Sequence, residues 1–238
     1  MSLLEVEAIN TYYGQSHILH DLSLNVEEGD LVTLVGRNGA GKTTTLKSIM
    51  GFQNPRTGTI TFDGVDISDN EPHETSQAGV SIIPEHRRVF PELTVVENLQ
   101  LGHMGHGLPD ERVEELTGRI YDYFPRLEER KQQRAGVMSG GEQQMLAIAR
   151  GLLSDPELLL VDEPTEGLMP SLVEKLREIL QRINDDGITI LLVEQNVELA
   201  LDISDYGYVV DEGEIKAQGS GKELAQDEDI KNRYLALG

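Results

Sequence analysis

A glycine-rich loop behind a short apolar run constrains this chain more than any other feature. The run is Leu31–Val35, and the loop reads Gly36-Arg37-Asn38-Gly39-Ala40-Gly41-Lys42-Thr43-Thr44. It fits the pattern G-x-x-x-x-G-K-[ST], and the residues after it read as a helix over Lys42–Met50. In this strand–loop–helix setting, glycines let backbone N–H groups turn inward around phosphates, and the helix N-terminus adds positive dipole. The loop therefore predicts a site for the phosphates of a nucleoside triphosphate.

Two residues of this loop have separate roles in the prediction. Lys42 is expected to reach the β- and γ-phosphates, and Thr43 to offer its hydroxyl to Mg²⁺. The residues predicted to contact the nucleotide are Gly36, Arg37, Asn38, Gly39, Ala40, Gly41, Lys42, Thr43 and Thr44.

A second apolar run ends in two adjacent acids, Asp162 and Glu163. The run is Leu158–Val161, which suits a fully buried parallel strand. Ligands bind at the carboxyl ends of such strands, so Asp162 is expected to hold Mg²⁺ through water. Glu163 is expected to polarise the water that attacks the phosphate. The alternative is an acid pair that caps a helix before Pro164, and the phosphate loop favours the catalytic interpretation.

The run Ser139-Gly140-Gly141-Glu142-Gln143-Gln144 opens a predicted helix that continues through Met145–Leu153. Small residues at a helix start favour a second phosphate contact. The same residues also fit an ordinary capping box, in which Ser139 is the N-cap and Glu142 its partner. The spacing alone leaves both interpretations open.

Together, the phosphate loop, the Ser139–Gln144 run and the acid pair resemble the motifs of ABC-transporter ATPases, and the resemblance covers the whole chain. It implies that the nucleotide is ATP and that two ATPase subunits pair head to tail. Each ATP would lie between the phosphate loop of one subunit and, in the other subunit, the start of the helix that the Ser139–Gln144 run opens (the signature helix). The residues expected to contact the ATP of the second subunit are Ser139, Gly140 and Gly141.

Three further positions take their expected roles from this resemblance. Tyr13 matches the aromatic residue that stacks on adenine; Tyr12 is the neighbouring candidate, and a core tyrosine is the alternative. After Pro84 the family usually has a glutamine that reaches magnesium, and Glu85 stands there as an expected metal ligand. Gln195 stands where the family has a catalytic histidine, and it is expected to donate a hydrogen bond to the γ-phosphate without titrating.

The order of the predicted elements, with this resemblance, implies an α/β fold. The expected architecture is a P-loop NTPase (RecA-like) core with an N-terminal antiparallel β subdomain and an inserted α-helical subdomain. Helical patterns such as Val95–Leu101 and Glu111–Phe124 replace strand patterns in the middle of the chain, and strand–helix alternation then resumes. The expected boundaries are 1–85 and 156–238 for the ATP-binding core and 86–155 for the helical subdomain.

Three runs, over 43–51, 84–91 and 193–196, resemble one subfamily, the ATPase subunits of branched-chain amino-acid importers. The resemblance implies membrane permease subunits as partners, a place at the cytoplasmic face of the membrane, and no direct contact with the transported solute. Importers of urea and short-chain amides are the alternative. A soluble ABC ATPase acting on DNA or ribosomes and a P-loop regulatory switch are two others.

Charge narrows the partners and the setting. Forty-two acids face twenty bases, which gives a net charge of −22, and only seven of the bases are lysines. Such a surface repels nucleic-acid phosphates, so no nucleic-acid partner is expected. The excess favours a halophilic chain in molar salt, where screening acts within about 3 Å; an acidic surface that only aids solubility is the alternative. The chain has no cysteine, and neither a signal peptide nor a transmembrane segment is expected.

Some residues are of types that often bind metals or partners, but they receive no catalytic role here. His103 and His106 lie in a glycine-rich loop without a third ligand, and no metal site is expected there. The His-Arg-Arg segment at 86–88 is expected to form a structural or subunit contact. Phe90-Pro91 fits either a docking spot for a membrane subunit or the core of the helical subdomain, and the sequence does not decide between them.

Overall fold

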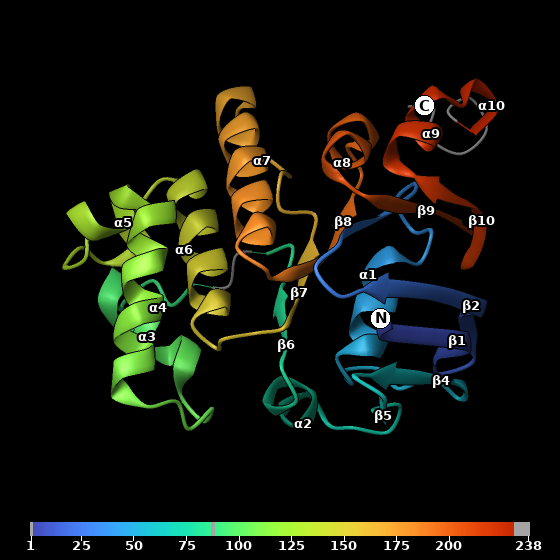
Figure 1. The fold of residues 1–238 in the computed structure, drawn as a ribbon, viewed down its shortest axis with the longest axis horizontal. Coiled ribbons are helices and arrows are strands. Elements are labelled where there is room, and N and C mark those ends of the chain that lie inside the picture. Colours follow the sequence, from blue (N-terminus) through green and yellow to red (C-terminus); the bar gives the residue numbers. More distant parts are fainter. Residues whose placement is uncertain (1, 87–88, 231–238) are drawn as a thin grey trace.

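The computed structural model describes residues 2–86 and 89–230 and contains two β-sheets (Figure 1). The first sheet is antiparallel, and its order is β2-β1-β4-β5. Its strands are β1 Ser2–Tyr13, β2 Ser16–Glu27, β4 Thr57–Phe62 and β5 Val65–Asp66. Alternating residues of β2 (Leu22, Leu24 and Val26) are buried, so one face of this sheet packs on the core. This sheet is the antiparallel β subdomain expected at the N-terminus.

The second sheet has the order β10-β9-β3-β8-β7-β6, and its strands pair in parallel except for β10, which runs antiparallel to β9. Its strands are β3 Leu31–Val35, β6 Val80–Ile83, β7 Leu158–Asp162, β8 Thr189–Glu194, β9 Tyr206–Asp211 and β10 Glu214–Ser220. β3, β7 and β8 are buried along their whole length, which explains their almost unbroken apolar sequences. Register pairs Asp162 with Val193 and Val35 with Glu194, so the carboxyl ends of these three strands meet at one edge.

Helices follow or separate the strands of the second sheet. Those outside the segment between β6 and β7 are α1 Lys42–Ile49, α2 Pro72–Gln77, α7 Pro170–Asp185, α8 Val197–Ile203, α9 Gly221–Gln226 and α10 Glu228–Ile230. Between β6 and β7 come α3 Val95–His103, α4 Asp110–Tyr123, α5 Pro125–Glu129, a 3-10 turn Ala135–Val137 and α6 Gly140–Leu152. Figure 1 shows this green-to-yellow group at the opposite end of the molecule from the antiparallel sheet. The boundaries at residues 86 and 155 stay a prediction.

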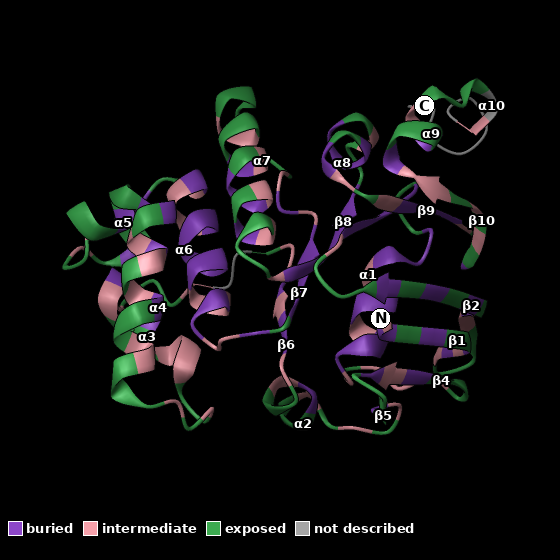
Figure 2. Cartoon of the chain, in the orientation of Figure 1, coloured by how far each residue is buried: buried purple, intermediate pink, exposed green. Residues whose placement is uncertain are grey.

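Buried side chains form two apolar clusters, one on each face of the second sheet. In Figure 2 the ribbon of β7 and β8 is largely purple, the colour of buried residues. Alternation along β3 divides its residues between the two clusters. Leu31 and Val35 belong to the cluster that includes α3 to α8, whereas Val32 and Leu34 belong to the cluster that includes the antiparallel sheet and α1. Close packing on both faces fixes β3, and therefore the start of the loop that follows it.

Several predicted segments match the observed elements closely. Leu31–Val35 is β3, and the helical pattern Glu111–Phe124 lies within one residue of α4 at each end. The segments β5, α2, α5 and β10 were not predicted. In α2 only Thr75 is buried, so the segment lacks the apolar period from which a helix is predicted. It is defined instead by Pro72 in its first turn and by a capping box between Glu71 and Glu74. Among the residues that the structure describes, no helix is long and apolar enough to cross a membrane.

Candidate nucleotide-binding site

The loop between β3 and α1 needs glycine at both ends, for different reasons. A Cβ on Gly36 would lie 2.2 Å from the carbonyl oxygen of Val210 in β9, so no larger residue fits. Gly41 is the N-cap of α1 and has a φ of 113°, which L side chains rarely adopt. In the β9–β10 turn, Gly213 donates its N–H to the carbonyl oxygen of Ala40 at 2.8 Å. The loop is thus held in place by β9 and by the β9–β10 turn.

Lys42 begins α1, and its ammonium group lies across the loop. Nζ donates hydrogen bonds to the carbonyl oxygens of Gly36 at 2.9 Å and Arg37 at 3.2 Å. It also forms an ion pair with Glu163 Oε1 at 3.1 Å. Because Lys42 is buried, the attraction is screened less than between surface charges. The predicted phosphate-binding lysine and the predicted catalytic acid therefore lie in direct contact.

Thr43 and Asp162 form a second contact beside the first. Thr43 Oγ1 donates a hydrogen bond to Asp162 Oδ1 at 3.1 Å. Burial raises the pKa of Asp162 to about 6, the Thr43 hydrogen bond opposes the rise, and the charges of Glu163 and Glu85 add to it. A bound cation would reverse this effect because it favours the ionised carboxylate.

The oxygen donors at this edge fit Mg²⁺, which prefers oxygen ligands and keeps several waters. A hydroxyl from Thr43 and a carboxylate from Asp162 already touch, and Glu85 is close enough to shift the pKa of Asp162. Within the described residues, no three carboxylates or histidines gather as a metal site of their own. Mg²⁺ would therefore depend on phosphate oxygens and water for its remaining ligands.

Glu163 and Gln195 lie where neighbouring strands end. Glu163 has a φ of 43°, a left-handed conformation that is uncommon for a residue other than glycine. Its N–H donates to the carbonyl oxygen of Val193 at 2.8 Å, which ties the end of β7 to β8. Gln195 follows β8 directly and is exposed, between the buried Glu194 and the α8 N-cap Asn196. The side chains of both candidate catalytic residues therefore start from the same edge of the sheet.

The two tyrosines before Gly14 differ in what covers them. The guanidinium of Arg56 and the ring of His17 each lie 4.0 Å from the centroid of the Tyr12 ring, so both of its faces are occupied. The Tyr13 side chain is 42% exposed. Of the two candidates, Tyr13 is the one that can accept a stacked base.

Ser139 is the N-cap of α6, as the capping-box interpretation expected. Its Oγ accepts the N–H of Glu142 at 3.3 Å, and Glu142 Oε2 accepts the N–H and the hydroxyl of Ser139, each at 3.0 Å. Gly141 is buried against α7, because a Cβ there would lie 2.3 Å from Leu172 Cδ1. Ser139 is exposed and Gly140 half-buried, so the helix start faces outward, and no described hydrogen bond joins it to the phosphate loop of the same chain.

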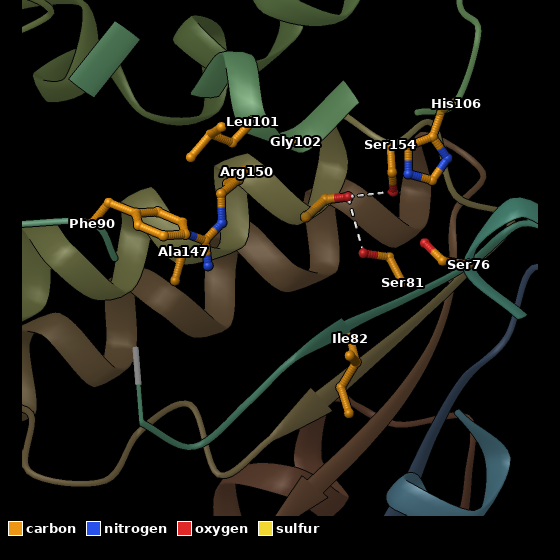
Figure 3. Close-up of a pocket in the computed structure, with 11 residues that line it drawn as sticks. Ser76, Ser81, Ile82, Phe90, Leu101, Gly102, His106, Ala147, Arg150 and Ser154 are labelled. Carbon is orange, nitrogen blue, oxygen red and sulfur yellow. Dashed lines mark hydrogen bonds between the residues drawn. The ribbon is translucent and has the colours of Figure 1, made fainter. Parts of the chain in front are cut away.

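A pocket of about 420 Å³ lies between the helical group and the sheet (Figure 3). Its residues come from α2, β6, α3, α6 and the loops beside them: Ser76, Ser81, Ile82, Phe90, Leu101, Gly102, His106, Ala147, Arg150, Gly151 and Ser154. Arg150 extends over the ring of Phe90, 5.5 Å from its centroid. Ser81 and Ser154 donate hydrogen bonds to the carbonyl oxygen of Gly151 at 3.1 and 2.8 Å. The sequence pointed to Phe90 alone, because the other lining residues lie far apart in the chain.

The remaining candidates stay outside the nucleotide site. Burial and the neighbouring His103 lower the pKa of His106. Among the described residues, this pair belongs to no cluster of three or more histidines or carboxylates that could hold a metal ion. His86 Nδ1 lies 3.5 Å from Glu85 Oε1. Arg87 and Arg88 lie outside the described residues.

Fold and site together define an ATPase of the P-loop class, and comparison with known proteins narrows the class to one family. The family model described as "ABC transporter" matches residues 19–166, more than half of the chain. The chain belongs to this family. It is an ATP-binding and ATP-hydrolysing subunit of an ABC transporter.

Three relatives match over almost their full lengths. The high-affinity branched-chain amino acid transport ATP-binding protein BraG of Pseudomonas aeruginosa is 41% identical, over 98% of this chain and 99% of the relative. A probable branched-chain amino acid transport ATP-binding protein, LivF of Archaeoglobus fulgidus, is 36% identical over 99% of each chain. The lipopolysaccharide export system ATP-binding protein LptB of Haemophilus influenzae is 33% identical over 99% and 98%.

Solved structures confirm the expected fold class. A nucleotide-free ATP-binding cassette from an ABC transporter superposes with a TM-score of 0.86, 28% identity and complete coverage of both chains. A cassette solved in its ADP conformation gives the same score and identity over 98% of each chain.

Proposed function

We propose that this chain powers an importer of branched-chain amino acids from the cytoplasmic face of the membrane. Support for the solute class comes from the two relatives named for that transport, at 41% and 36% identity. An importer of urea or short-chain amides is the alternative. Uptake of labelled leucine and of labelled urea by cells that lack the chain separates them: loss of leucine uptake alone supports the proposal, and loss of urea uptake alone contradicts it.

The catalytic proposal rests on one observation, the contact of Lys42 with Glu163 beside the Thr43–Asp162 pair. In the proposed reaction the β- and γ-phosphates take over the hydrogen bonds of Lys42 Nζ and release the Glu163 carboxylate. Glu163 then polarises the attacking water, while Lys42 and the backbone N–H groups of the loop stabilise the charge on the phosphate. Mg²⁺ held by Thr43 and Asp162, with Glu85 beside them, would supply further neutralisation.

The other predicted site residues complete the proposed environment of ATP. Gln195 donates a hydrogen bond to the γ-phosphate from the end of β8, and Tyr13 stacks on adenine. The rest of the loop (Gly36, Arg37, Asn38, Gly39, Ala40, Gly41 and Thr44) surrounds the phosphates with backbone N–H groups. Because an amide does not titrate near neutral pH, Gln195 contributes no pH switch.

Glu163→Gln tests the catalytic role because it keeps the shape of the side chain and removes its charge. ATP binding should be retained, and turnover should fall by about 100-fold or more, as for loss of a general base. Nucleotide titration and phosphate release measure the two effects. Glu157→Gln, an exposed acid just before the opposite end of β7, is the matched control and should keep full turnover. Unchanged turnover in Glu163→Gln would contradict the assignment.

A second ATPase subunit, either a copy of this chain or a related one, is the proposed partner at the start of α6. Val137 and Met169 are exposed apolar residues just before Ser139 and just before α7. The two helices begin side by side, since Gly141 packs on Leu172. Exposed apolar side chains beside an outward helix start suit an interface at which Ser139, Gly140 and Gly141 meet the partner's ATP. Sedimentation of Glu163→Gln with ATP should give a dimer.

The pocket of Figure 3 is the proposed docking site for a membrane permease subunit. It lies on the seam between the helical group and β6, so a partner seated there would feel any motion of one against the other. Phe90 is 49% exposed at its rim, which favours docking over a role in the core. Burial lowers the pKa of the Arg150 guanidinium, which lines the pocket beside the Phe90 ring.

Phe90→Ala should reduce co-purification with the permease subunits several-fold without changing the ATP affinity of the isolated chain, because it removes an apolar anchor remote from the loop. Phe52→Ala, which removes a side chain that is 56% exposed after α1, is the control and should co-purify normally. Equal retention of the permease by both variants would place the docking surface elsewhere.

The acidic surface supports a proposal about the setting, a cytoplasm rich in salt. The chain has forty-two acids and twenty bases, so its excess negative charges repel one another. Molar salt screens this repulsion within about 3 Å.

A further inference from the structure

Glu194 is a buried carboxylate with no role in the mechanism above. It ends β8, one residue before Gln195, and is 1% exposed. In sequence it looks like the polar end of an apolar strand. Removing a carboxylate from water is costly unless hydrogen bonds compensate it, so its partners indicate why it is there.

The partners of Glu194 belong to two different loops. Its Oε1 accepts the backbone N–H of Thr165 at 3.1 Å, and its Oε2 accepts the backbone N–H of Asn196 at 3.3 Å. Thr165 lies in the loop between β7 and α7, and Asn196 caps α8, where its own side chain accepts the N–H of Leu199. One carboxylate thus joins the loops that leave two neighbouring strands.

Each of these loops carries a proposed catalytic residue. Glu163 precedes Thr165 by two residues, and Gln195 lies between Glu194 and Asn196. The left-handed backbone of Glu163 is the kind of strained conformation that persists only where surrounding contacts fix it. The hydrogen bond from Thr165 to Glu194 is such a contact, and it adds to the bond from the Glu163 N–H to Val193.

We propose that Glu194 is a positioning residue that holds the Glu163 loop and the Gln195 loop in register, so that both side chains meet the same γ-phosphate. The inference rests on the proposed hydrolytic role of those two residues. Burial raises the pKa of Glu194, opposed by its hydrogen bonds with Thr165 and Asn196, and the nearby Glu163 raises it further. Such a group is kept at a cost, which agrees with a role beyond packing.

Glu194→Ala and Glu194→Gln in the full chain test the proposal by separating affinity from turnover. The alanine variant should bind MgATP with a Kd and a KM within about twofold of the original chain, while kcat falls about 10- to 100-fold, because a misplaced reactive group costs rate more than affinity. Glutamine keeps one acceptor oxygen, so Glu194→Gln should lie between the two. It also provides the measurement if the alanine variant does not fold.

The control is Thr189→Val at the opposite end of the same strand. Thr189 is also buried, and its Oγ1 accepts the N–H of Gly29 at 3.0 Å, so the variant loses one buried hydrogen bond far from the two loops. It should keep kcat. A kcat unchanged in both Glu194 variants, or a loss of affinity equal to the loss of kcat, overturns the positioning role alone. Absence of turnover in the original chain would overturn the proposed function itself.

Discussion

At the scale of single residues, the site is organised by charges removed from water. Lys42 has Glu163 as its counterion, Asp162 has the hydroxyl of Thr43, and Glu194 has two backbone N–H groups. Each of these groups can meet a ligand or a neighbouring loop, and burying its charge is costly. Stability and function should therefore respond in opposite directions to substitution here.

Asp162→Asn should stabilise the nucleotide-free protein at neutral pH but not in acid. The pKa of Asp162 is raised from 3.8 to about 6, chiefly by burial, so the folded protein holds this proton more tightly than the unfolded chain. The stability that the proton contributes is fully present below about pH 4 and is lost as the pH rises through 6, a difference of about 2–3 kcal/mol. Asparagine, which never ionises, escapes that loss.

Chemical denaturation in EDTA between pH 4 and pH 8 measures the effect. Asp122→Asn, at an exposed position on α4, is the control and should leave the pH dependence unchanged. An Asp162→Asn variant stabilised equally at both ends of the range would point to packing instead of titration.

At the scale of elements, the capping box of α6 combines a structural and a functional role. The hydroxyl of Ser139 donates to Glu142 within the chain, so the same hydroxyl must leave this acceptor before it can donate to a phosphate. An identical box, Ser220 with Glu223, caps α9 away from the site.

Ser139→Ala and Ser220→Ala should each lose about 1 kcal/mol of stability, because each removes one helix cap. Only Ser139→Ala should also lose turnover, with its own loop still binding ATP. Thermal melts and phosphate release measure the two quantities in parallel. If both variants keep the same turnover, Ser139 is a cap and nothing more.

The sequence was sufficient for the elements that carry periodic apolar residues and for the motifs at their ends. It chose Tyr13 over Tyr12 by resemblance alone, because the contact that covers Tyr12 comes from Arg56, which is distant in sequence and lies just before β4. It also gave no sign of Glu194, since its two partners lie on loops that only the register of β7 and β8 brings together. What was missed are contacts between distant segments, which local patterns do not encode.

At the scale of the whole molecule, the chain balances a packed interior against a surface that repels itself. Two apolar clusters pack on the two faces of the second sheet. The net charge of −22 opposes this compaction at every distance shorter than the screening length.

Raising KCl from 0.1 M to 2 M should increase the melting temperature by several degrees, because the Debye length shortens from about 10 Å to below 3 Å. Differential scanning calorimetry across the series measures the change. Sucrose, which strengthens burial without screening charge, is the control. A melting temperature that does not change with KCl would contradict adaptation to high salt.

The ion pair between Lys42 and Glu163 makes nucleotide binding an exchange of counterions. The lysine has an anionic partner before the phosphates arrive and another afterwards, so it gains no additional ion pair in the process. Lys42 should therefore add little of its own to the ionic-strength dependence of MgATP affinity, unlike a lysine facing bulk water. A lone phosphate ion, which brings few other contacts, has little with which to displace the carboxylate. With Lys42 paired to Glu163, the loop should therefore bind the whole nucleotide in preference to its fragments.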